Sequence, residues 1–170
     1  MAGNARRRLT VEWQDPAPLA RAAGEMAGLD FLRAIQAGTL PSPPIARLLG
    51  FDLVEAEPGR AVFAVVPGER HYNPIGVVHG GLAATLCDSA MGCAVQSLLP
   101  AGAGYTTLEF KINFVRAVTR ETGRLRCEAS IVHLGRRSGV ASARLVDAAG
   151  TLYAHATTTC LVFRPQGEGK

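Results

Sequence analysis

The sequence predicts an α+β fold in which a curved antiparallel sheet wraps around one long central helix, preceded by a helical extension. Apolar residues recur at helical spacing across residues 79–98, and small residues occupy much of the opposite face, so this helix should be buried nearly all round. Strand-like alternation precedes the helix as a hairpin and follows it as four successive strands. This order of elements suits one antiparallel sheet curved around one helix.

The chain is long enough to form one ordered domain. Its 170 residues should bury roughly two-thirds of the surface that the unfolded chain exposes. Because 48% of the residues are hydrophobic and 19% are charged, we expect an ordered protein that needs neither a disulfide nor a metal to fold. We divide it into an N-terminal helical extension with a Pro-rich connector (1–44), a main domain (45–164) and a short tail (165–170).

The N-terminal extension has a mixed pattern. Apolar side chains in residues 16–36 have a roughly helical spacing that Gly24 and Gly28 interrupt, which predicts one or two short helices. Residues 39–44 form the Pro-rich connector. A short helical turn is expected over residues 45–50, where a glycine ends it.

Early in the main domain, from Phe51, the spacing of apolar residues changes from a helical period to a period of two. Residues 51–54 and 61–65 predict a hairpin. After the central helix, apolar residues alternate with polar ones and predict a long half-buried strand that contains Leu108, Phe110, Ile112 and Phe114. Three further strands are expected at 123–133, 138–146 and 151–163. A hairpin, one long buried helix and four more strands make up the hotdog architecture.

Charge and cysteine content restrict the partners and the compartment. The net charge of +4 and the pI near 9.2 suit an anionic partner, but the basic residues are scattered from Arg6 to Arg164, which favours a small molecule over nucleic acid. The four cysteines lack C-x-x-C spacing and the N-terminus lacks a secretory signal, so we expect a cytoplasmic protein. The longest apolar run is broken by Asp88, Gly92 and Gln96, which argues against a membrane span.

The most informative stretch is residues 71–88, where a loop runs into the start of the central helix. Gly80 and Gly81 leave backbone amides unpaired at this start, with the positive end of the helix dipole behind them. Such amides can stabilise a developing oxyanion, and glycine lets a ligand approach the backbone closely.

Asp88 lies about two turns into the same helix, among small and apolar residues. A carboxylate in such surroundings is costly unless it is paired or used, and it can then act as a general base or a nucleophile. The alternative is that Asp88 lies on an exposed stripe together with Thr85 and Ser89.

Together these positions form a pattern with specific spacing: Asn73, His79, Gly80, Gly81, Asp88, Thr106 and Thr107. Over about residues 45–164, this pattern resembles the hotdog thioesterases of the phenylacetate-degradation type. The resemblance implies an acyl-CoA thioesterase that needs no cofactor beyond the coenzyme A of its substrate.

The resemblance also assigns catalytic roles. It implies that Gly80 donates its amide to the thioester carbonyl and that Asn73 binds and orients the reacting groups. Asp88 would activate water or attack the carbonyl directly. Thr107 would steady that water, with Thr106 as the alternative one residue away.

Basic residues are expected to bind the substrate. Arg136 and Arg137 match basic residues that meet the nucleotide end of coenzyme A in the family, and guanidinium groups suit phosphates because they offer paired donors. The alternative for each arginine is a solvated charge in the turn. Arg116, at the end of the long strand, is likewise either a substrate-binding residue or a solvated charge. His79 and Gly81 complete the expected substrate-binding set, with the His79 ring ordering the loop rather than acting as a base.

Two other kinds of site are not expected. His71, His133 and His155 are isolated in the sequence and have no metal-ligand spacing, so we predict no metal site. Cys87 is expected to be a small core residue, because free cysteines are commonly buried and inert.

Two alternatives to hydrolysis stay open, namely a hydratase or dehydratase acting on acyl thioesters and a non-catalytic acyl-CoA-binding protein. The former enzymes typically use an Asp/His or His/Glu dyad, which this pattern lacks. The resemblance further implies a homodimer or homotetramer in which Asn73 and Gly80 of one subunit face Asp88 and Thr107 of another. The acyl group itself is left open by the sequence.

Overall fold

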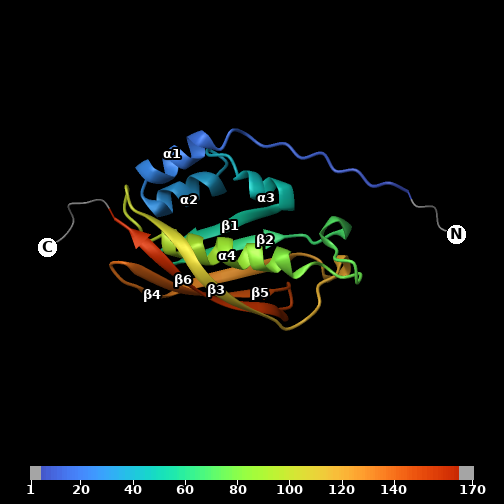
Figure 1. The fold of residues 1–170 in the computed structure, drawn as a ribbon. Coiled ribbons are helices and arrows are strands. Elements are labelled where there is room, and N and C mark those ends of the chain that lie inside the picture. Colours follow the sequence, from blue (N-terminus) through green and yellow to red (C-terminus); the bar gives the residue numbers. More distant parts are fainter. Residues whose placement is uncertain (1–4, 165–170) are drawn as a thin grey trace.

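The computed structural model describes residues 5–164 and has the hotdog architecture that the sequence predicts (Figure 1). Six strands form one antiparallel sheet in the order β1-β2-β4-β5-β6-β3. The predicted tail at 165–170 lies outside the described residues. The strands are β1 (Phe51–Glu57), β2 (Arg60–Val65), β3 (Gly104–Phe114), β4 (Leu125–Leu134), β5 (Ser138–Val146) and β6 (Leu152–Phe163).

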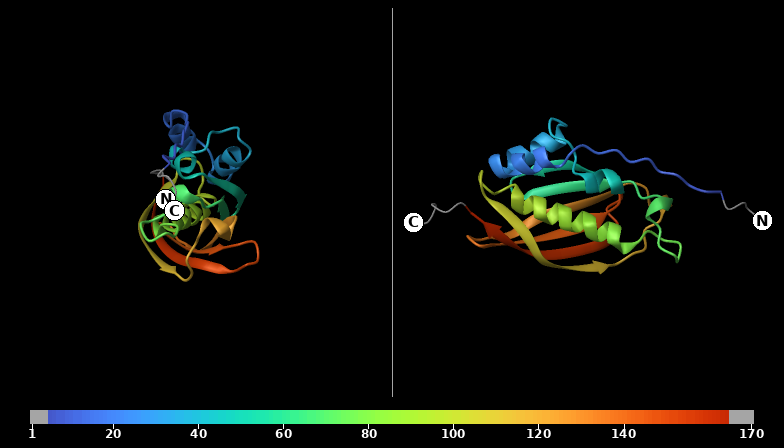
Figure 2. Two further views of the ribbon diagram at one scale, coloured as in Figure 1. Left: turned by 90° about the vertical axis from the view of Figure 1, so that its right-hand side faces the viewer. Right: turned by 45° about the horizontal axis from the view of Figure 1, so that its top comes forward.

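The long helix α4 (Gly80–Gln96) lies in the hollow of this sheet, which curves around it (Figure 2). Its inner face supplies the centre of the core with Leu86, Ala90 and Met91, each fully buried. The helix ends two residues before the predicted end, because the amides of Leu98 and Leu99 bond to carbonyls three residues back and tighten the last turn.

The N-terminal extension contains α1 (Ala17–Glu25) and α2 (Gly28–Gln36), and α3 (Pro44–Leu49) follows the connector, so the predicted helices are confirmed. All three lie on the β1 side of the molecule (Figure 2). A side chain at Gly28 would place its Cβ 1.7 Å from the Gln96 carbonyl oxygen, and the Gly28 amide donates to the Leu99 carbonyl at 2.9 Å. Glycine therefore allows the start of α2 to rest on the end of α4.

β3 differs from the expected half-buried strand. Leu108 and Phe114 are 60% and 58% exposed, because β3 is an edge strand that pairs with β6 alone. A β-bulge between Thr107 and Glu109 also changes which residues face α4. Such a bulge adds one residue to one strand and so reverses the alternation beyond it, which a strict period of two does not anticipate.

Candidate active site

The start of α4 is held by a side-chain cap. The Nδ1 atom of His79 accepts a hydrogen bond of 2.8 Å from the Gly81 amide, so this ring caps the helix as an N-cap residue. A Cβ at Gly81 would lie 2.8 Å from the same nitrogen, which explains glycine at this position. The Gly80 amide has no hydrogen-bond acceptor among residues 5–164, so it is available to a ligand.

The loop before α4 is closed by Asn73. Its Oδ1 atom accepts hydrogen bonds from the amides of Ile75 (3.1 Å) and Val77 (3.3 Å), and its own amide donates to the Val77 carbonyl at 2.8 Å. The side-chain oxygen is therefore used within the loop. The Nδ2 amino group is left as the part of Asn73 that can donate to a substrate.

A pocket of about 400 Å³ opens beside the start of α4. Its lining includes His79 and Gly80, together with Phe114 at the end of β3 and Arg116 two residues beyond it. The Phe114 ring lies so close to Gly80 that a Cβ there would come within 3.0 Å of it. The structure thus brings Arg116 next to the predicted oxyanion-binding amide.

Asp88 and Thr107 meet in the middle of α4. The Thr107 hydroxyl donates a hydrogen bond of 2.9 Å to Oδ1 of Asp88, across the gap between α4 and β3. Thr106, the alternative from the sequence, is exposed. Thr107 precedes the β-bulge, which allows it and Phe114 beyond the bulge both to face α4.

The surroundings of Asp88 are only partly buried. Asp88, Thr85 and Ser89 lie on a stripe of α4 that neither the sheet nor the N-terminal helices cover completely. The stripe that the sequence offers as the alternative for Asp88 is thus present, and it is half-buried rather than exposed. Asp88 differs from its neighbours on the stripe because a second side chain binds it.

The ionisable groups near Asp88 toward the end of α4 are thiols and a phenol that stay neutral. Burial, followed by the nearby Asp88 charge, raises the pKa of the Cys93 thiol to about 12. Burial is also the main reason why the pKa values of Cys160 and Tyr105 are raised. These thiols therefore stay protonated near neutral pH and are poor nucleophiles. Cys87 is fully buried, as predicted for a core residue.

Arg136 and Arg137 lie away from the start of α4. They form the turn between β4 and β5. Just after this turn, Gly139 pairs with Cys160 of β6, and Cys160 pairs in turn with Thr107 of β3. Neighbouring strands are about 4.8 Å apart, so Gly139 lies about 10 Å from Thr107. Both arginines are exposed.

The predicted residues therefore fall into two groups within one chain. The helix-start group contains Asn73, His79, Gly80, Gly81 and Arg116, and the mid-helix group contains Asp88 and Thr107 with the two arginines beyond them. An α-helix rises about 1.5 Å per residue, so about 12 Å separates Gly80 from Asp88 along the axis. One carbonyl group cannot contact both within a single chain.

Tyr105 and Phe114 are site residues that the sequence analysis does not single out. Tyr105 packs on α4 at Gly92, where a Cβ would lie 2.2 Å from its hydroxyl oxygen. Each of these contacts pairs an aromatic ring with a distant glycine. The glycines are visible in the sequence, but the strand residue that fills the space above each one is not.

Two general features of the described residues bear on function. Within residues 5–164, no three His, Cys, Asp or Glu side chains gather closely enough to hold a metal ion. In the same part of the chain, no helix is both long and apolar enough to cross a membrane.

Comparisons with known proteins show the family of the chain. Residues 75–154 match the family model of the thioesterase superfamily. A Halobacterium salinarum protein that bears the provisional name of an esterase is 40% identical over 114 residues, which cover 64% of this chain and 74% of that protein. The 1,4-dihydroxy-2-naphthoyl-CoA hydrolase of Listeria monocytogenes is 25% identical over 100 residues, covering 58% of this chain and 79% of that enzyme.

A solved relative extends the similarity to the fold. A variant of the phenylacetic acid degradation protein PaaI from Thermus thermophilus superimposes with a TM-score of 0.64 at 28% identity, covering 72% of this chain and all of that one (100%). On the strength of this fold, this arrangement of residues and these relatives, the chain belongs to the thioesterase superfamily and is PaaI-like.

Proposed function

We propose that the protein hydrolyses an acyl-CoA thioester to a free acid and coenzyme A. The observation that carries the proposal is the Asp88–Thr107 pair, a carboxylate oriented by a hydroxyl on the open stripe of a thioesterase-superfamily helix. Within residues 5–164, the second carboxylate oxygen, Oδ2, has no hydrogen-bond donor. That oxygen is free to accept a proton from water or to attack a carbonyl carbon.

In the proposed reaction, the thioester carbonyl accepts a hydrogen bond from the Gly80 amide. Water attacks the carbonyl carbon and gives a proton to Asp88, and the amide and the helix dipole stabilise the negative charge that forms on the oxygen. The C–S bond then breaks, and the departing thiolate takes the proton from Asp88. Alternatively, Asp88 attacks the carbonyl carbon and the C–S bond breaks, which gives a mixed anhydride and the thiolate of coenzyme A. Water then opens the anhydride to the free acid and regenerates Asp88, and the proton released goes to the thiolate.

The separation of the two groups along α4 supports a site that two subunits share. Because about 12 Å separates Gly80 from Asp88, we infer that Asn73 and Gly80 of one chain act with Asp88 and Thr107 of its partner. The apolar residues that β3 exposes at the sheet edge, among them Leu108, suit burial in a homodimer or homotetramer.

Coenzyme A would be bound by cationic side chains near each group. Arg136 and Arg137 are exposed, and neither forms a salt bridge within residues 5–164, so their guanidinium groups are available to phosphates. Arg116, in the pocket beside Gly80, offers a further cation. The name of the Listeria monocytogenes relative, a CoA-ester hydrolase, is consistent with this substrate class.

The test is to incubate the purified protein with a panel of acyl-CoA thioesters while free thiol and conjugated double-bond absorbance are followed together. Release of thiol without a change in the double bond is the expected result. A change in double-bond absorbance without thiol would instead indicate a hydratase or dehydratase. Binding without either signal would indicate an acyl-CoA-binding protein.

A further inference from the structure

An apolar pocket of about 340 Å³ lies beneath the N-terminal helices. Ala20 and Ala23 of α1 line one wall, Leu53 and Phe63 of β1 and β2 line the opposite wall, and Cys93 of α4 lies at the inner end. Ser42 and Asp52 are the polar residues of this lining. The pocket is therefore suited to hydrocarbon and offers little to a polar ligand.

The size of the pocket is unusual for a contact between helices and a sheet. Protein interiors are close-packed and rarely hold voids much larger than a water molecule. Here α1 inserts one buried side chain, Leu19, while alanines face the open space. A helix that served only to cover the sheet would fill this space with larger side chains. The pocket therefore has room for an apolar ligand.

The inner end of the pocket and the proposed catalytic carboxylate lie on the same helix, α4. Cys93 follows Asp88 by five residues on α4, which is about 7.5 Å along the helix axis. The two side chains are close enough for the Asp88 charge to act on the Cys93 thiol. An acyl chain whose carbonyl group is held at Asp88 would thus reach the inner end of the pocket, at Cys93, after several carbons.

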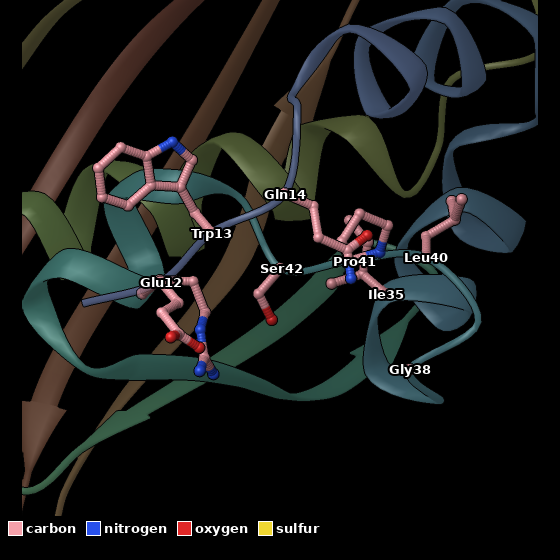
Figure 3. Close-up of a pocket in the computed structure, with 9 residues that line it drawn as sticks. Glu12, Trp13, Gln14, Ile35, Gly38, Leu40, Pro41 and Ser42 are labelled. Carbon is pink, nitrogen blue, oxygen red and sulfur yellow. The ribbon is translucent and has the colours of Figure 1, made fainter. Parts of the chain in front are cut away.

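The outer end of the pocket is bounded by Ile35 and Ser42. Both residues also line a second hollow of about 470 Å³ on the other side, together with Trp13, Glu12 and Arg47 (Figure 3). Because Glu12, Gln14 and Arg47 make that hollow much more polar than the pocket, a hydrocarbon chain gains less by extending into it. Ile35 and Ser42 should therefore set the maximum length of an occupant.

The walls of the pocket come mostly from parts of the chain outside the family model. That model covers residues 75–154, whereas α1, α2 and the hairpin of β1 and β2 all precede it. The family model therefore does not describe this pocket, whose walls can differ from one member of the family to another. Substrate preference is a property that such variable walls can supply.

We propose that this pocket binds the unbranched aliphatic acyl chain of the substrate, so that the N-terminal extension determines acyl length. The inference rests on the proposed function, because it takes the carbonyl group to be held at Asp88. A methylene group occupies about as much space as a water molecule in the liquid, about 30 Å³, so the pocket holds on the order of ten carbons. Medium-chain acyl-CoA esters are therefore the expected substrates.

The experiment measures binding of two unreactive thioethers, S-ethyl-CoA and S-decyl-CoA, to the full-length protein by isothermal titration calorimetry. Wild-type protein should bind S-decyl-CoA at least about 100-fold more tightly, because additional methylene groups are buried. Ala23→Trp fills the pocket and should reduce this ratio at least about tenfold, while the Kd for S-ethyl-CoA stays within about twofold. Glu25→Trp, at an exposed position of the same helix about 160° around its axis from Ala23, is the matched control and should change neither value.

Equal affinity of wild-type protein for the two thioethers would overturn the inference, as would an unchanged ratio in Ala23→Trp. If Ala23→Trp fails to fold, Ala20→Trp, which also alters the lining of the pocket, replaces it with the same expectation. Hydrolysis is measured separately with decanoyl-CoA. Tight, pocket-dependent binding of S-decyl-CoA without hydrolysis of decanoyl-CoA would support the pocket and contradict the proposed function, so the two failures are distinguishable.

Discussion

The residue on which the proposed chemistry depends is Asp88, because it combines a free carboxylate oxygen with a fixed orientation. Asp88→Asn keeps the shape and the Thr107 contact but cannot take up a proton or attack a carbonyl. We expect kcat for acyl-CoA hydrolysis to fall by at least about 100-fold, with the melting temperature nearly unchanged. Ser89→Ala, on the same stripe of α4, is the control and should retain activity. Near-normal turnover of Asp88→Asn would remove the carboxylate from the mechanism.

His71 makes the loop before α4 sensitive to acid. Its Nδ1 atom accepts from the Gly68 amide at 3.0 Å, and its Nε2 atom lies 2.9 Å from the Leu49 carbonyl, so the buried ring is neutral with its proton on Nε2. Burial, and then the Arg70 cation, lower the pKa of His71 below its ordinary value of 6.5. The unfolded chain therefore takes up this proton more readily than the folded chain does.

The stability that depends on neutral His71 is fully present above about pH 6.5 and is lost as the pH falls through the lower pKa of the folded state. We expect thermal denaturation of the wild type to show a falling melting temperature between about pH 7 and pH 5. His71→Phe should be less stable overall but flatter over this range. The same pH dependence in both proteins would assign it to another group.

At the level of single residues, the sequence identifies groups whose chemistry is unusual for their local surroundings. Asp88 is conspicuous as a lone carboxylate in an apolar helix, and Gly80 as a glycine at a helix start. Tyr105 is not conspicuous, because its importance depends on a contact with Gly92 across the fold. The role of His71 in closing the loop likewise depends on a carbonyl twenty-two residues earlier.

At the scale of helices and strands, the contact between α4 and β3 at Gly92 predicts that one substitution has opposite effects on stability in two backgrounds. A Cβ at Gly92 would lie 2.2 Å from the Tyr105 hydroxyl and 2.8 Å from its ring, so Gly92→Ala should destabilise the wild type by about 1–3 kcal/mol. In a Tyr105→Ala background the obstacle is gone, and the same change should stabilise the protein by up to about 1 kcal/mol, because alanine favours helix over glycine.

Urea unfolding of the four proteins at one fixed protein concentration measures both effects, since oligomerisation makes stability depend on concentration. If Gly92→Ala destabilises both backgrounds equally, the Tyr105 ring is not the reason for glycine at this position.

The proposed role of the turn between β4 and β5 in binding coenzyme A can be tested by comparing two substrates. Replacing Arg136 and Arg137 with alanine should raise KM for CoA esters several-fold, because phosphate contacts are lost. A short thioester without the nucleotide has no such contacts to lose, so its KM should stay the same. Arg144→Ala, an exposed arginine of β5, serves as the control. An equal loss for both substrates would assign the two arginines a structural role.

Most elements are predictable because their periodicity is local. The bounds of β5 agree with the sequence pattern residue by residue, and the bounds of α4 differ by a residue or two at each end. The exposure of β3 is not predictable in this way. Its alternation of apolar residues is regular, but the bulge after Thr107 and the edge position are set by pairing with β6, which lies about fifty residues later in the chain.

For the whole molecule, the central claim is that one chain contains two halves of different active sites. The helix-start and mid-helix groups lie about 12 Å apart on α4, too far for one thioester carbonyl. The sequence pattern contains every residue of both groups, yet the spacing along the helix only becomes a constraint once α4 is known to be straight and continuous from Gly80 to Gln96.

Subunit complementation tests this claim most directly. Asn73→Ala and Asp88→Ala chains, each nearly inactive alone, are co-expressed so that mixed dimers form, and mass spectrometry confirms their presence. In a mixed dimer one site carries both lesions and the other carries none. Random assortment makes about half of the dimers mixed, so about a quarter of wild-type activity should return. If confirmed mixed dimers have no more activity than either variant alone, all four catalytic residues act within one chain and the shared site is wrong.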